Sequence, residues 1–192
     1  WYNLYLVSFN VYADHIDMDY WRKLCVNNGK LSSYKKGEYF QSKGLRHKIR
    51  WGVIKSGYFK YTVISTNGEE HIVGFAFAGT FVGDYLSIIS DNNDEINIVA
   101  SVDSKVWICD REVLDNALSN NPIICRTIVD NLFQQIYKSF LDMYRLSPKE
   151  RYLELVHRCP DILQNVSLKE IASYLNITPT HLSRLRKEIT FG

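Results

Sequence analysis

The chain has 192 residues, of which 46% are hydrophobic and 14% aromatic, and its formal net charge is +2. This composition excludes intrinsic disorder and allows one large domain or two small ones. No run of about 18 apolar residues occurs, which excludes a membrane-spanning helix. The apolar N-terminal stretch lacks the basic region and cleavage site of a signal peptide, so we expect a cytoplasmic protein without membrane contact.

The first half of the chain contains short runs of β-branched and aromatic residues, which are typical of strands. The runs are 37–40, 51–54, 58–64, 71–77, 96–100 and 105–108. Turn residues separate them, and Asn67-Gly68 between two apolar runs is a strong signal for a β-hairpin. Short strands at this spacing predict a sandwich or barrel.

After Asp110 the pattern becomes helical, and Asn121-Pro122 indicates the start of a long helix because proline is tolerated in a first turn. Two adjacent apolar stripes follow, and two stripes over about six turns imply burial on two sides. One side would pack on the barrel and the other on the same helix of a second chain; a core helix of a larger monomer is the alternative. The residues assigned to the dimer interface are Ile124, Ile128, Leu132, Ile136 and Phe140. The second stripe contains Cys125, Val129, Phe133, Tyr137, Leu141 and Tyr144.

Residues 167–189 carry the features of a helix-turn-helix in the right order. The capping-box pattern of Ser167 and Glu170 predicts the start of one helix. Asn176 stands where the turn needs a left-handed residue, and Thr178 followed by proline predicts the start of a second helix.

The second helix of this motif has leucines on one face and hydroxyls and cations on the other. Arg184 is predicted to reach a guanine edge or a phosphate, and Arg186 and Lys187 to contact phosphates. The whole excess of positive charge lies in 147–192, which hold seven basic and five acidic side chains. The residues expected at the DNA are Ser167, Thr178, Thr180, His181, Ser183, Arg184, Arg186 and Lys187. An ordinary helical hairpin with a solvated basic face is the alternative.

A barrel, a long helix and a helix-turn-helix in this order resemble the Crp/Fnr superfamily of bacterial regulators. The segments that carry the resemblance are 37–40, 56–60, 78–84, Ala100 with Val106, and 167–189. The resemblance implies an α+β fold. It would consist of an N-terminal antiparallel β-barrel of the cyclic-nucleotide-binding, double-stranded jelly-roll type, a long dimerisation helix and a C-terminal helix-turn-helix of the winged-helix type.

The resemblance also implies how the chain is divided and what it binds. Residues 1–118 would form an N-terminal helical segment and an effector-sensing barrel, 119–146 the dimerisation helix, and 147–192 the DNA-binding domain. The implied partners are double-stranded DNA and a second copy of the chain, with RNA polymerase and an unidentified small-molecule effector as further candidates. Arg184 stands where the family has an arginine that reads DNA.

The candidate effector-pocket residues also come from the resemblance, and they are Gly83, Asp84, Tyr85, Asp94 and Glu95. Members that bind cyclic nucleotides carry a Gly-Glu pair followed by an Arg-Ser pair, where this chain has Gly83-Asp84 and Asp94-Glu95. A cyclic phosphate prefers a cation and amide donors, and carboxylates repel it. We therefore expect no cofactor and no cAMP binding in the family's mode.

Two alternatives come from other functional classes. A cupin-like enzyme would need a His-x-His pair and a carboxylate for its metal, and the five histidines do not have that spacing. No nucleophile elbow, P-loop or HExxH motif occurs either, so we expect neither an enzyme nor a metal site. The other alternative is a ligand-binding or protein-interaction module whose C-terminal helices only dimerise, without DNA binding.

Overall fold

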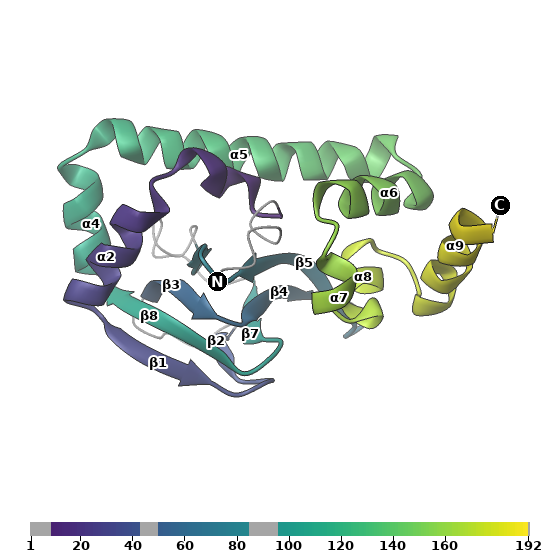
Figure 1. Cartoon of the computed structure of the whole chain (residues 1–192), viewed down its shortest axis with the longest axis horizontal. Coiled ribbons are helices and arrows are strands. Elements are labelled where there is room, and N and C mark those ends of the chain that lie inside the picture. Colours follow the sequence, from purple (N-terminus) through teal and green to yellow (C-terminus); the bar gives the residue numbers. More distant parts are fainter. Residues whose placement is uncertain (1–8, 43–49, 85–95, 192) are drawn as a thin grey trace.

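The computed structural model describes residues 9–42, 50–84 and 96–191, and two antiparallel four-stranded sheets form its N-terminal half (Figure 1). The first sheet has the order β1 (Lys30–Tyr34), β8 (Ser104–Asp110), β3 (Arg50–Ser56) and β6 (Phe81–Val82). The second has the order β2 (Tyr39–Gln41), β7 (Asn97–Ala100), β4 (Tyr58–Ile64) and β5 (Glu70–Phe77). The predicted α+β fold, with an antiparallel β-barrel ahead of C-terminal helices, is confirmed.

The barrel interior is filled by apolar side chains from both sheets, because alternate residues of a strand point to the same face. Its buried members include Phe40, Ile54, Phe59, Val82, Ile98 and Val106. The predicted hairpin joins β4 to β5, and its Gly68 has a φ of +86°, a left-handed conformation that favours glycine. Two strands are missing from the sequence prediction: β1 is largely polar and exposed, and β6 has only two residues.

Helices cover one end of the barrel and make up the C-terminal part of the chain. The N-terminal ones are the 3₁₀ helix η1 (Val11–His15) and α2 (Met18–Asn28). After the barrel come α4 (Arg111–Ser119), α5 (Pro122–Arg145), α6 (Pro148–Arg158), α7 (Ile162–Asn165), α8 (Leu168–Tyr174) and α9 (Pro179–Phe191). None of the helices in the described part of the chain has the length and apolarity needed to cross a membrane.

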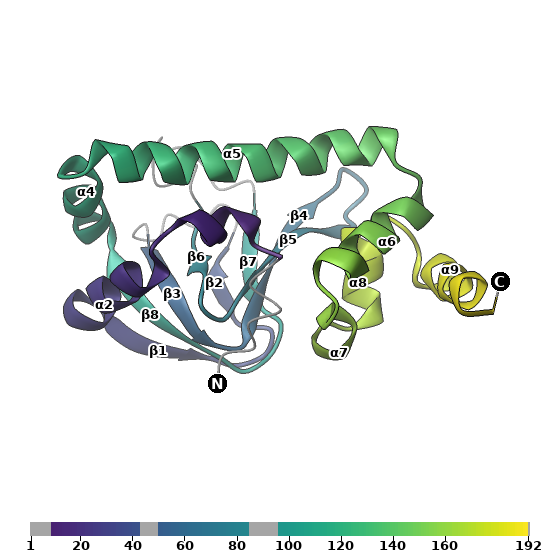
Figure 2. The same cartoon turned by 45° about the horizontal axis from the view of Figure 1, so that its top comes forward.

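The long helix α5 begins as predicted, because the Asn121 side chain accepts a hydrogen bond from the Ile124 amide at 3.3 Å. It runs along the barrel and reaches the C-terminal helices (Figures 1 and 2). Ile124 and Ile128 pack against the buried cluster around Trp21, Trp51 and Leu114 of the same chain. Two of the five residues assigned to the dimer interface therefore face their own barrel.

Apart from Ile123 in its first turn, the exposed apolar side chains of α5 lie in its C-terminal two thirds. Six side chains there are each at least half exposed: Phe133, Ile136, Tyr137, Phe140, Met143 and Tyr144. Ile136 and Phe140 come from the stripe assigned to the dimer, and Phe133, Tyr137 and Tyr144 from the second stripe. Both stripes are thus partly exposed, but Leu132, Ile136 and Phe140 line a hollow between α5 and the barrel, whereas Phe133, Tyr137 and Tyr144 do not. The side of α5 that faces away from the barrel therefore carries the second stripe rather than the one assigned to the dimer.

Candidate nucleic-acid interface

The first helix of the motif, α8, begins with the predicted capping box. The Glu170 amide donates to Ser167 Oγ at 3.3 Å, and the Ser167 amide donates to Glu170 Oε2 at the same distance. The Ser167 hydroxyl also donates to that carboxylate at 2.8 Å. Ser167 was expected at the DNA, but its hydroxyl is engaged in this cap.

Glu170 keeps its negative charge although it is half-buried. Burial would raise the pKa of its carboxyl, but hydrogen bonds from surrounding hydroxyls, those of Ser167 and Tyr58 among them, hold the pKa below its ordinary value. The carboxylate is therefore an acceptor at neutral pH.

The turn between α8 and α9 has the predicted geometry. Asn176 has a φ of +55°, and Thr178 Oγ1 accepts a hydrogen bond from the His181 amide at 3.1 Å, with Pro179 as the first residue of α9. The sequence prediction missed Arg151 of α6, which donates to the Leu175 carbonyl at 3.0 Å and to the Leu146 carbonyl at 2.8 Å. Arginine commonly makes such multiple contacts, but no local pattern identifies their carbonyl partners.

Close packing fixes the rotation of α9 about its own axis. Ile171 and Ala172 of α8 are fully buried, and Leu182 and Leu185 of α9 are buried with them. The small side chain of Ala172 leaves room for the second helix. With its leucines held, α9 presents the rest of its surface outward.

The outward surface of α9 contains the predicted hydroxyls and cations. Thr180, His181, Ser183, Arg184 and Lys187 are exposed, whereas Arg186 is half-buried. Within residues 9–42, 50–84 and 96–191, no ion pair involves Arg184 or Lys187. α9 lies at the opposite end of the molecule from α4, so the barrel does not cover it (Figure 1). These side chains can reach an anionic partner.

Comparisons with known proteins agree with this architecture. Residues 31–121 match the model of the cyclic nucleotide-binding domain, while no curated protein matches the chain by sequence. The structure of FixK2 from Bradyrhizobium japonicum is 19% identical, with a TM-score of 0.69 and 84% of each chain covered. The c-di-GMP-responsive global regulator CLP from Xanthomonas campestris is 16% identical, with a TM-score of 0.66 over 88% of this chain and 89% of that one.

A third similar structure comes from Eubacterium rectale and is assigned to the Crp/Fnr family of transcriptional regulators. It is 16% identical, with a TM-score of 0.66 over 96% of this chain and 88% of that one. The chain has the fold of the Crp/Fnr superfamily. Within it, the match to the cyclic nucleotide-binding domain model takes in the strands of the barrel.

In this Crp/Fnr fold, the first pair of candidate effector residues lies beside a large hollow. The Tyr61 hydroxyl donates to the Gly83 carbonyl at 3.2 Å and accepts from the Gly83 amide at 3.3 Å. Asp84 is buried, and its carboxylate accepts a hydrogen bond from Gln41 Nε2 at 3.4 Å. Tyr61, Gly83 and Asp84 line a hollow of about 950 Å³ that extends between the barrel and α5.

The other candidate effector residues, Tyr85, Asp94 and Glu95, lie outside the described residues. Among the residues described, no three His, Cys, Asp or Glu side chains are grouped closely enough to hold a metal ion. The geometry on which a candidate site can be built is therefore that of α8 and α9, with the hollow as a second feature.

Proposed function

We propose that this chain is a non-enzymatic, homodimeric transcription regulator of the Crp/Fnr type that binds double-stranded DNA through α9. The single observation that carries the proposal is the outward face of α9, whose exposed hydroxyls and cations are held in place by the buried Leu182 and Leu185. The three parts proposed are a sensor barrel in 1–118, a dimerisation helix in 119–146 and a DNA-binding domain in 147–192.

The proposed mode of binding places α9 in the major groove. Arg184 would form a bidentate contact with a guanine edge or reach a phosphate, because its guanidinium presents paired donors. Lys187 and Arg186 would contact phosphates, and Thr180, His181 and Ser183 would lie near bases or backbone at the start of the helix. Phosphate contacts would position the protein, and contacts with base edges would select the sequence.

The DNA-binding proposal is tested by removing two cations from α9. For the Arg184→Ala/Lys187→Ala variant we expect a Kd for duplex DNA that is raised at least about tenfold. The slope of log Kd against log salt should also fall, by about 1 if Arg184 reads a guanine edge and by about 2 if it contacts a phosphate, since each lost phosphate contact removes about 0.9. Filter binding on sequences selected from genomic fragments measures both quantities.

The matched control removes the same charge far from α9. Lys23→Ala/Lys30→Ala changes exposed lysines of α2 and β1, and its Kd should stay within about twofold of the wild-type value because these side chains contact no DNA. If the wild type and both variants were retained equally on DNA at moderate salt, the result would favour the alternative, a ligand-binding or protein-interaction module that does not bind DNA.

The dimer proposal is supported by the exposed apolar side of α5. Exposed apolar patches of this kind mark interaction surfaces, and a second copy of α5 would cover the aromatic side chains of Phe133, Tyr137 and Tyr144. A two-fold dimer would present two α9 helices to two half-sites of DNA.

Sedimentation tests the dimer. The wild-type protein is expected at twice its chain mass of 22.4 kDa. Phe133→Asp, which buries a charge in the proposed interface, should give a monomer at micromolar concentration. The control is Gln134→Asp, which adds the same charge at an exposed position of the same helix and should stay dimeric. A monomeric wild type would contradict the proposal.

We further propose that the hollow beside Asp84 does not take a cyclic nucleotide in the family's mode. A buried carboxylate in its wall supports this, because a cyclic phosphate next to it would be repelled. Thermal unfolding with millimolar cAMP should show no stabilisation, and a clear rise in Tm would contradict the proposal.

A further inference from the structure

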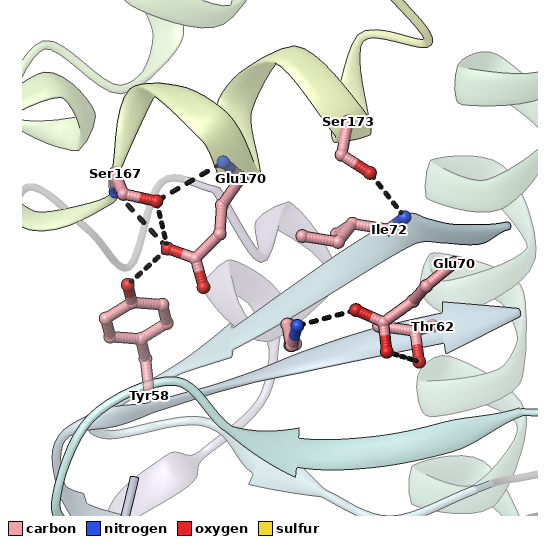
Figure 3. A network of polar contacts seen from close by, with 8 residues as sticks. Tyr58, Thr62, Glu70, Ile72, Ser167, Glu170 and Ser173 are labelled. Atoms are coloured by element: carbon pink, nitrogen blue, oxygen red, sulfur yellow. Dashed lines mark hydrogen bonds and ion pairs between the residues drawn. The ribbon is translucent and has the colours of Figure 1, made fainter. Parts of the chain in front are cut away.

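Helix α8 is attached to the barrel as well as to α9. The Tyr58 hydroxyl of β4 donates to Glu170 Oε2 at 3.0 Å, and the Ile72 amide of β5 donates to Ser173 Oγ at 3.0 Å (Figure 3). Glu170 is the same residue that completes the cap of α8. One carboxylate therefore joins the start of the helix-turn-helix to the barrel.

A continuous apolar core lies around these hydrogen bonds. The barrel contributes Tyr58, Ile72, Phe75 and Phe77, and the helix-turn-helix contributes Ile171, Ala172, Leu175 and Leu182. Phe9 is wedged between the two parts, with its ring centroid 5.5 Å from that of Phe75 and 5.3 Å from that of Tyr174. Because Phe9 and Phe75 are both at most 3% exposed, the two parts share a packed interior.

Strand β4 connects this contact with the hollow. Its residues alternate between two faces: Tyr58 points outward to α8, while Phe59 and Tyr61 belong to the barrel interior. Tyr61 exchanges two hydrogen bonds with the backbone of Gly83, next to Asp84 in the wall of the hollow. A displacement of Gly83 would therefore shift Tyr61, which lies only three residues from Tyr58 on the same strand.

The two strands under α8 are also braced to each other. Glu70 of β5 accepts hydrogen bonds from Lys60 Nζ at 2.7 Å and from Thr62 Oγ1 at 3.3 Å, both on β4 (Figure 3). Because these side-chain contacts add to the backbone hydrogen bonds that pair the two strands, Tyr58 and Ile72 should move together.

We infer that Tyr58 is a positioning residue for DNA binding: through Glu170 it fixes the orientation of α8, and so of α9, relative to the barrel. The β4–β5 hairpin thereby links the hollow to the DNA-binding face within a single chain. This inference rests on the proposed function. A fixed orientation lowers the entropy lost when the two α9 helices of a dimer engage two half-sites.

The test is Tyr58→Phe, which removes the hydroxyl and keeps the ring in its packed position. We expect the Kd for DNA to rise about threefold to tenfold, which corresponds to the net worth of one ordinary intramolecular hydrogen bond, because Tyr58 acts only through the orientation of α8. The salt slope of log Kd should not change, because Tyr58 contacts no phosphate. Amide exchange of residues 168–175 should become faster, while that of the barrel strands β3 and β8 is unchanged.

Two further variants keep the test decisive. Ser173→Ala removes the acceptor of the Ile72 amide and should act in the same direction, even if Tyr58→Phe fails to fold. Tyr39→Phe removes the hydroxyl of an exposed tyrosine on β2 and should match the wild type in both measurements.

Wild-type affinity and exchange in both Tyr58→Phe and Ser173→Ala would overturn the inference, and so would tighter DNA binding, which would make the contact inhibitory. A wild-type protein without DNA binding would instead refute the proposed function. The two failures are therefore distinguishable.

Discussion

The two helices of the helix-turn-helix differ in what their polar side chains contact. On α8, Glu170 and Ser173 form hydrogen bonds with the barrel. On α9, Arg184 and Lys187 are exposed, and no ion pair within the described ranges involves them. Both helices are amphipathic, but polar side chains of α8 form hydrogen bonds with the barrel, whereas those of α9 are exposed at the surface.

This difference shows that an amphipathic pattern identifies the buried face of a helix and not the use of its polar face. Polar groups that are satisfied inside a protein stabilise one arrangement, and polar groups left at the surface are available to a ligand. Variants of the two helices should therefore affect different properties.

The largest effect is expected where the two helices share one core. Leu182→Ala removes a side chain that is 1% exposed and should lower the free energy of unfolding by about 2–5 kcal/mol, because a buried cavity remains. Denaturant unfolding followed by circular dichroism measures the change. Leu153→Ala on α6, where the side chain is 42% exposed, should cost much less; equal costs would mean that Leu182 is not part of this core.

The two caps allow a more specific comparison. Ser167→Ala and Thr178→Ala each remove one capping oxygen and should each cost about 1 kcal/mol of stability. Amide exchange should separate them: Ser167→Ala should speed exchange in the first turn of α8, and Thr178→Ala in the first turn of α9. If either variant sped up amide exchange in both helices, the two caps would not stabilise their helices independently.

The smallest effect is expected from the pH dependence of α8. Because the pKa of Glu170 lies below its ordinary value of 4.5 in the folded protein, its contribution to stability is full above that pH and is lost as the pH falls through the lowered pKa. Glu170→Gln should therefore flatten the decline of the unfolding free energy on acidification. Tyr58→Phe, which removes one hydrogen bond to the carboxylate, should flatten it partly. An unaltered acid profile in Glu170→Gln would contradict the role of this carboxylate.

The features that the sequence predicts well are local. Asn67-Gly68 predicts the β4–β5 hairpin, and the cap at Ser167, the turn at Asn176 and the start of α9 at Thr178 lie within about a dozen residues. Each depends on backbone conformation or on a hydrogen bond between near neighbours, so residue type and spacing are enough to indicate it.

The features that the sequence does not predict depend on distant pairings. Tyr58 and Glu170 are 112 residues apart, and no period in either segment indicates that they meet. The orientation of the α5 stripes also depends on distant residues. Ile124 and Ile128 are directed toward the barrel because they pack against the buried cluster around Trp51. Binary patterns specify a buried face, whereas the partner of that face is decided by the assembled fold.

Strand β5 is the last strand of its sheet, and α8 covers part of its outer side through the hydrogen bond from the Ile72 amide to Ser173. A bare strand edge is a template on which the strand of another molecule can add. Release of the helix-turn-helix would thus uncover a surface suited to aggregation. The few contacts that orient the helix-turn-helix would also protect solubility, and selection for one property would constrain the other.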